Sequence, residues 1–96
     1  MPEQRTLDEE KNALRAVLNR FVTAQAKRLI DKAEQGYLGW DNPEYTNWIC
    51  NKLFSDAQFL ADNKVVDPRI YIDIANRAMM LWAMQEGKEQ QETGND

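Results

Sequence analysis

Apolar residues recur at helical spacing along the first third of the chain. Between residues 7 and 34 they return every three or four positions, as on the buried stripe of an α-helix. The members of this stripe are Leu14, Val17, Leu18, Phe21, Val22, Leu29 and Ile30. Thr6 and Glu9 have the spacing of a capping box at its start, and Gly36 is suited to end a helix. We therefore expect one long helix over residues 7–34.

A loop with glycines and a proline separates this helix from a second one. Residues 36–43 read Gly-Tyr-Leu-Gly-Trp-Asp-Asn-Pro, a composition that favours turns. Either Asp41 or Asn42 is expected to cap the next helix, with Pro43 in its first position. This second helix is predicted to end near Asn63. Its apolar stripe consists of Tyr45, Ile49, Leu53, Ala57 and Leu60.

The last helical stretch is apolar almost throughout. After a linker at residues 64–66, Asp67 is expected to cap a third helix that has Pro68 in its first position. Nearly every residue from 70 to 84 is apolar, and a helix that is apolar on all sides is expected to be buried on all sides. The predicted fold class is all-α, a small bundle of three main helices that is completed by oligomerisation.

Length and composition favour a single domain. The chain has 96 residues, of which 43% are apolar and 29% charged, and these values fit one globular unit. We place the domain at residues 6–87, between a flexible N-terminus at 1–5 and a disordered polar tail at 88–96. Because so short a chain covers its apolar faces poorly, we expect a homo-oligomer, most simply a dimer. The side chains expected against a second subunit are Met80, Trp82 or Met84.

Charge and residue types narrow the possible functions. The formal charge is −4, with +1 on residues 1–36 and −5 on residues 37–96, so no direct nucleic-acid binding is expected. No run approaches the roughly 18 apolar residues of a membrane span, and the start of the chain lacks the apolar core of a secretory signal. One cysteine and no histidine leave no internal disulfide and disfavour a zinc site. We therefore expect a cytoplasmic protein that does not associate with membranes.

Three polar residues interrupt the apolar third helix. Asp73 is followed by Asn76 and Arg77 at spacings of three and four, which places all three on one side of a helix. An acid in such a helix is costly unless it is paired, hydrogen-bonded or bound to a cation. Asp73 therefore either pairs with Arg77 or a basic residue of the first helix, or faces a cavity with Asn76 and binds a ligand or Mg²⁺. A third interpretation is that this side of the helix faces water.

Asp56, on the second helix, has two interpretations of its own. It lies off the apolar stripe of that helix, so it is either a solvated surface acid or a partner of Asp73 across the helix pair. In the second case the two carboxylates share one metal ion, for which Mg²⁺ is the candidate.

The loop between the first two helices is another candidate for ligand contact. Tyr37 and Trp40 either cover the end of the bundle or present aromatic faces to a base. The nearby basic residues are Lys27, Arg28 and Lys32, which are suited to phosphate groups. An aromatic loop beside several cations is the combination that a nucleotide needs.

With these residues identified, the chain resembles the MazG-like branch of the all-α nucleoside triphosphate pyrophosphohydrolases. The segment 21–25 and the loop 36–40 are similar to the first helix and the Gly-Trp loop of that family. Lys52 and Leu53 open the segment in which the family has Glu-Glu-x-x-Glu. Residues 73–81, Asp-Ile-Ala-Asn-Arg-Ala-Met-Met-Leu, look like its closing Asp-Val-Ala-Asn-Phe-x-Met-Met motif. Small proteins of phages and other mobile elements show a similar pairing of motifs.

The resemblance implies an oligomeric helical bundle with a defined chemistry. In the family, acidic helices hold Mg²⁺ on a nucleoside triphosphate, and water attacks to give the monophosphate and pyrophosphate. The family's acidic positions fall here on Ser55, Asp56, Phe59, Ile70 and Asp73. Two of the five expected carboxylates remain, so the resemblance implies that the pocket survives better than the chemistry.

Three functional hypotheses follow from these features. The first is a catalytically degenerate MazG-like protein that binds a nucleotide or a protein partner, with no catalytic residue assigned. The second is a working Mg²⁺-dependent pyrophosphohydrolase with a reduced acidic set. The third is a small acidic mobile-element protein that uses residues 37–96 to inhibit a host nucleic-acid-handling system. The metal residues would be Asp56 and Asp73. The nucleotide-binding residues would be Tyr37, Trp40, Lys27, Arg28 and Asn76.

Overall fold

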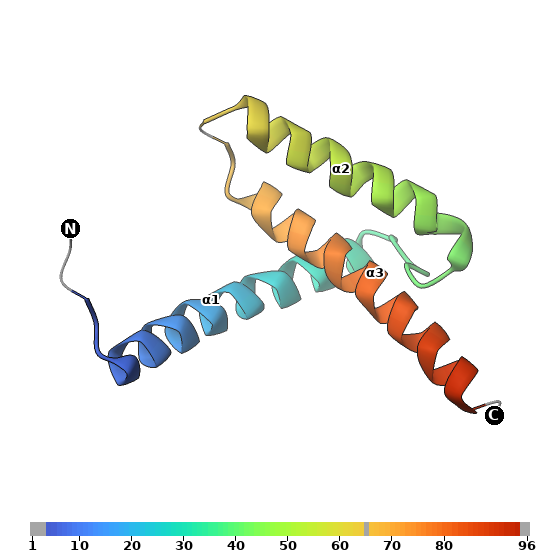
Figure 1. Cartoon of the computed structure of the whole chain (residues 1–96). Coiled ribbons are helices and arrows are strands. Elements are labelled where there is room, and N and C mark those ends of the chain that lie inside the picture. Colours follow the sequence, from blue (N-terminus) through green and yellow to red (C-terminus); the bar gives the residue numbers. More distant parts are fainter. Residues whose placement is uncertain (1–3, 65, 95–96) are drawn as a thin grey trace.

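The computed structural model describes residues 4–64 and 66–94, which fold into three α-helices and one short 3₁₀-helix. The elements are α1 (Leu7–Glu34), η1 (Pro43–Tyr45), α2 (Thr46–Asp62) and α3 (Arg69–Gly94). α2 and α3 lie side by side, and the end of α1 crosses α3 near its middle (Figure 1). The described residues contain no strand, and the predicted all-α class is confirmed.

Local sequence signals set both ends of α1. The backbone N–H of Glu9 donates to Thr6 Oγ1, and the backbone N–H of Thr6 donates to the Glu9 carboxylate, both at 3.2 Å. These two bonds form the predicted capping box. At the other end Gly36 has a φ of +98°, a conformation that suits a residue without a Cβ. The N–H of Tyr37 closes the turn by donating to the Lys32 carbonyl at 3.1 Å.

A side-chain cap and a proline precede each of the two later helices, but neither helix begins at its proline as predicted. α2 begins at Thr46 without a side-chain cap of its own, and α3 begins at Arg69, one residue after Pro68. Asn42 provides the first cap, because its Oδ1 accepts from the Glu44 N–H at 3.0 Å. Pro43 then occupies the first position of η1, which leads directly into α2. Asp67 provides the second cap by accepting from the Arg69 N–H at 2.9 Å. Each of these caps satisfies a backbone donor that the helix itself leaves unpaired.

α3 occupies the centre of the fold, since it packs against both α1 and α2. Among the described side chains, Ile49 of α2 and Asn76 of α3 are buried. The single chain does not bury α3 on all sides, since Tyr71 is 52% exposed and Trp82 is 62% exposed, and the second subunit expected to complete its burial stays a prediction. Two neighbouring helices cover two sides of a central helix and leave the others open.

The far end of α3 departs from the expected boundary. The sequence predicts a disordered tail from residue 88, whereas the helix continues past Gly87 to Gly94. Residues 88–92 are Lys, Glu, Gln, Gln and Glu, all good helix formers, and no proline stops them. Residues 1–3 of the expected flexible N-terminus, 65 of the linker and 95–96 of the tail lie outside the described residues. None of the described helices has the length and apolar run that a membrane crossing requires.

Candidate functional site

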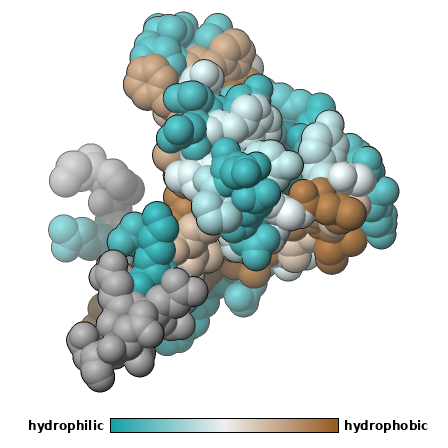
Figure 2. Space-filling view, turned by 90° about the vertical axis from the view of Figure 1, so that its right-hand side faces the viewer, coloured by the Kyte–Doolittle hydropathy of each residue, from teal (hydrophilic) through white to brown (hydrophobic). Residues whose placement is uncertain are grey.

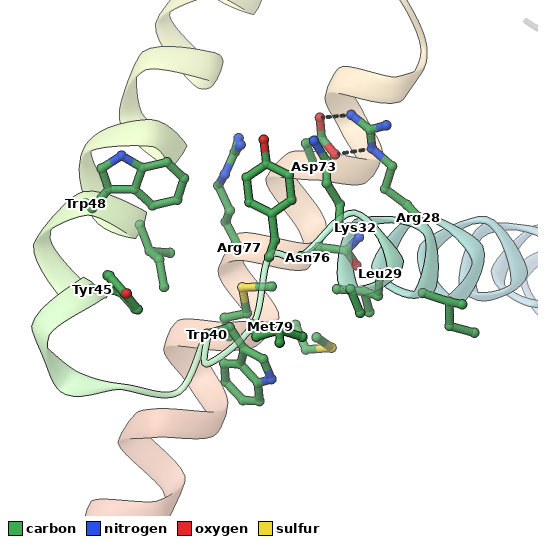
Figure 3. Close-up of a pocket in the computed structure, with 17 residues that line it drawn as sticks. Arg28, Leu29, Lys32, Trp40, Tyr45, Trp48, Asp73, Asn76, Arg77 and Met79 are labelled. Carbon is green, nitrogen blue, oxygen red and sulfur yellow. Dashed lines mark hydrogen bonds and ion pairs between the residues drawn. The ribbon is translucent and has the colours of Figure 1, made fainter.

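A cavity of about 720 Å³ lies where the end of α1, the following loop, the start of α2 and the middle of α3 meet (Figure 3). Its size is in the range of small-molecule pockets, roughly 300–1,000 Å³. Both aromatic and charged side chains line the cavity. Residues from all three helices and from the loop that contains the expected Gly-Trp pair therefore converge on one place.

The aromatic lining comes from two segments. Tyr37 and Trp40 belong to the loop between the helices, while Tyr45 and Trp48 belong to η1 and the first turn of α2. All four remain open to solvent, with exposed fractions between 42% for Trp40 and 65% for Tyr37. Gly39 supports the bend before Trp40 with a φ of +76°. Ring faces that stay accessible in this way are suited to stack on a planar ligand.

An ion pair between α1 and α3 stands at the edge of the pocket. Arg28 donates through Nε and Nη2 to the two carboxylate oxygens of Asp73, at 2.9 and 3.2 Å (Figure 3). Burial alone would raise the pKa of the Asp73 carboxyl, but the hydrogen bond and charge of Arg28 outweigh it and hold that pKa below its ordinary value of 3.8. Asp73 therefore pairs with a basic residue of the first helix, one of the predicted alternatives.

A second ion pair connects α3 to α2. Arg77 donates to Asp56, and the two side chains are only 20% and 23% exposed. Asp56 is therefore not a solvated surface acid, and its expected role as a metal partner of Asp73 stays a prediction. Asp73 and Arg77, one turn apart, each reach a different neighbouring helix, so α3 is attached to both α1 and α2 through charge.

Asn76, which lies between these two ion pairs on α3, also bonds to α1. The Gln25 amide donates to Asn76 Oδ1 at 3.1 Å, and Asn76 Nδ2 donates to the Gln25 carbonyl at 3.5 Å. With 4% of its surface exposed, Asn76 needs these partners, because a buried amide without hydrogen bonds is costly. It also lines the pocket, where it was predicted to contact a ligand.

The lysines near the end of α1 differ sharply in their surroundings. Lys27, predicted to bind a nucleotide, is not among the lining residues and pairs with Asp31 at 2.8 Å on an exposed face. Lys32 lines the pocket, and its Nζ lies 4.8 Å from the centre of the Tyr37 ring. Within the described part of the chain Lys32 forms no ion pair. Lys32 is thus the pocket cation whose charge no carboxylate balances.

The arrangement of the acids does not favour a resident magnesium ion. Both carboxylates expected to bind the metal, Asp56 and Asp73, are engaged by arginines, so a cation would have to displace a guanidinium. The residues that the structure describes contain no group of three or more potential metal ligands among Asp, Glu, His and Cys. Mg²⁺ stays a prediction for this chain.

Sequence reasoning placed Tyr37, Trp40, Arg28 and Asn76 at one site, and the structure brings these four together around the pocket. It did not assign Trp48 and Tyr45 to that site. Their signal was present, because two aromatic residues three positions apart at the start of a helix lie on the same side. That side lines the pocket because of how α2 packs against α3.

Comparisons of the chain with protein-family models, with curated proteins and with solved structures each found no match. The resemblance to the MazG-like family therefore depends on the motifs alone, and the geometry of the pocket is the basis for any functional proposal.

Proposed function

We propose that the pocket binds a nucleotide, with the base against the aromatic lining and the phosphates toward Lys32. One observation carries the proposal: the same cavity holds four aromatic residues and three cations, Arg28, Lys32 and Arg77, against a single lining carboxylate, that of Asp73. Because Asp73 pairs with Arg28 and Asp56 pairs with Arg77, the local excess is the one positive charge of Lys32, in a chain whose formal charge is −4. A ligand with a planar apolar part and an anionic part matches such a lining.

The cations have capacity left for phosphate oxygens. Lys32 has no carboxylate partner among the described residues, and its three N–H donors are suited to a phosphate. Arg28 uses Nε and Nη2 for Asp73, which leaves further guanidinium donors.

The aromatic residues supply the other part of the binding energy. Stacking of a base on an aromatic side chain contributes about 1–3 kcal/mol and depends little on which base it is. Trp48 is 55% exposed and Trp40 is 42% exposed, so each has ring surface to offer. We therefore expect weak preference among bases and a clear preference for nucleotides over inorganic phosphates.

The ion pairs support binding over hydrolysis. Metal-assisted phosphoryl transfer requires carboxylates that are available to hold Mg²⁺ on the phosphates. Here Asp56 and Asp73 each face an arginine, which competes with a cation for the same oxygens. The MazG-like pyrophosphohydrolase remains the second hypothesis, and it predicts release of pyrophosphate that the binding proposal does not.

Calorimetric titration of the full chain tests the proposal. Nucleoside mono-, di- and triphosphates and inorganic triphosphate are each titrated into the protein, first in buffer that contains EDTA and then in buffer that contains Mg²⁺. Pyrophosphate release is assayed in parallel. We expect binding in EDTA that is tighter for nucleotides than for inorganic triphosphate. Lys32→Gln should weaken it by a factor between about 10 and 150, since a hydrogen bond to a charged group contributes roughly 1.5–3 kcal/mol.

Lys27→Gln is the matched control, because it removes the same charge from the same helix outside the pocket. It should leave the affinity within about twofold. Equal losses in both variants would mean that only the overall charge matters and would contradict a defined site. If the titrations give no binding heat with any nucleotide, and circular dichroism shows that the chain is helical, the result would favour the protein-partner hypothesis. Turnover with Mg²⁺ would favour the enzyme.

A further inference from the structure

The first half of α1 carries an apolar stripe that the rest of the described chain does not cover. Leu7, Leu14 and Leu18 are 69%, 57% and 56% exposed, and no residue of α1 is buried. They share one helix face with Phe21, Gln25 and Arg28, since the intervals alternate between three, four and seven residues. Gln25 and Arg28 contact α3, so the stripe continues a face that already packs on a helix. In Figure 1 this half of α1 extends away from α2 and α3.

The surface area of the chain is far larger than a folded monomer of this mass requires. The accessible area is 8,090 Å², whereas about 5,700 Å² is expected for a globular protein of 11.2 kDa. The radius of gyration is 17.0 Å against about 12.5 Å for a compact domain of this length. The excess of roughly 2,400 Å² exceeds the ~800 Å² that each partner contributes to a standard interface. Apolar side chains reach the surface beside hydrophilic ones in Figure 2.

A helix in this position needs a partner to be stable. Isolated helices of fewer than about 12–15 residues are marginal in water, and most helical stability in proteins comes from packing of an apolar face. The capping box at Thr6 and Glu9 stabilises the start of α1 but buries nothing. The length of exposed stripe between Leu7 and Leu18 calls for another helix with the same kind of face.

We infer that a second copy of this chain covers the stripe, with the two α1 helices antiparallel in a homodimer. The charges along α1 favour this orientation. Its first turn is acidic, with Asp8, Glu9 and Glu10, of which Glu10 pairs with Arg5. The basic residues that follow, Lys11, Arg15 and Arg20, form no ion pair within the described residues. A parallel pair would place acid beside acid, while an antiparallel pair places the acidic turn of one copy beside the basic segment of the other. The inference is independent of nucleotide binding.

Sedimentation or light scattering of the full chain at micromolar concentration measures the assembly. We expect a species of twice the 11.2 kDa chain mass. Leu14→Glu should shift it to the monomer, because it places a charge in the middle of the interface. Asn12→Glu is the control, since it adds the same charge on the opposite face of the helix and should leave the dimer intact. A wild-type monomer would overturn the inference and leave the stripe for a different protein.

Cross-linking tests the orientation without requiring a folded monomeric variant. In a Cys50→Ser background, which removes the exposed native thiol, Leu7→Cys chains are mixed with Val22→Cys chains and treated with a short bis-maleimide. Both positions are exposed, and an antiparallel pair brings position 7 of one copy near position 22 of the other. We expect covalent dimers in the mixture and few in Leu7→Cys alone. The reverse result, or no covalent dimer in either sample, would overturn the antiparallel pairing.

Discussion

At the scale of single residues, the polar side chains of α3 explain how an apolar helix carries charge. Asp73 lies among apolar neighbours and is only 22% exposed, yet Arg28 neutralises it with two hydrogen bonds. Arg77, one turn further on, is neutralised by Asp56 in the same way. Asp73 and Arg77 thus each have a partner on another helix, which a largely buried ionised side chain requires.

Replacing Asp73 separates the two leading hypotheses, because they predict opposite signs. In the binding proposal Asp73→Asn removes a negative charge beside the phosphates and releases Arg28, so nucleotide affinity in EDTA should rise severalfold. If the carboxylate instead holds Mg²⁺, affinity measured with Mg²⁺ should fall. Calorimetric titration under the two conditions gives the answer, and a loss of affinity in EDTA would contradict the proposed role of Arg28.

The same substitution should lower stability, since an unpaired arginine remains in a half-buried place. We expect a loss of about 1–2 kcal/mol in the free energy of unfolding from urea titration. Asp31→Asn is the matched control, because Asp31 pairs with Lys27 on an exposed face at i, i+4. Its effect should stay within roughly 0.5 kcal/mol. Equal losses would show that the Arg28 pair contributes no more than a surface pair.

At the scale of elements, the loop between α1 and α2 shapes the aromatic side of the pocket. Gly36 ends α1 and Gly39 precedes Trp40, both with positive φ. Neither glycine has another group within 4 Å of where a Cβ would stand, so space is not what selects glycine there. The backbone conformation selects glycine, because residues other than glycine rarely adopt a positive φ.

Alanine substitutions at two glycines should therefore have opposite effects. Gly39→Ala forces a Cβ into a left-handed conformation and should cost about 1–2 kcal/mol of unfolding free energy, with weaker nucleotide binding as Trp40 shifts. Gly87→Ala lies in an open position within α3 and should stabilise by roughly 0.5–1 kcal/mol. Urea unfolding of both variants measures the difference. A neutral Gly39→Ala would show that the loop readily adopts another conformation.

At the scale of the whole molecule, the single chain leaves much of its apolar surface exposed. α3 lies between its two neighbours, but large apolar residues such as Leu14, Phe54 and Trp82 stay more than half exposed. The expectation that a second subunit covers Met80, Trp82 or Met84 stays a prediction. Since Trp82 lies on α3 and Leu14 on the first half of α1, a partner that covers both would have to contact two separate helices.

If folding is completed by a second copy, stability must depend on protein concentration. Unfolding of a dimer releases two chains, so mass action raises the thermal midpoint as the concentration rises. We expect the midpoint to increase between about 1 and 100 µM for the wild-type chain and for Asn12→Glu, but not for Leu14→Glu. Calorimetry or circular dichroism at several concentrations measures it, and a constant wild-type midpoint would speak against coupled folding and assembly.

The sequence by itself determined where helices begin and which faces are apolar, because capping residues, prolines and glycines act within a few positions of where they stand. Thr6 and Asp67 cap as their local sequence predicts, and Asn42 caps the short η1 that leads into α2. Only the tertiary structure decided which ion-pair partners the charged side chains have. Asp73 had Arg77 at the right spacing on its own helix, yet it pairs with Arg28, 45 positions earlier. Long side chains reach several partners from one position, and the crossing of the helices selects among them.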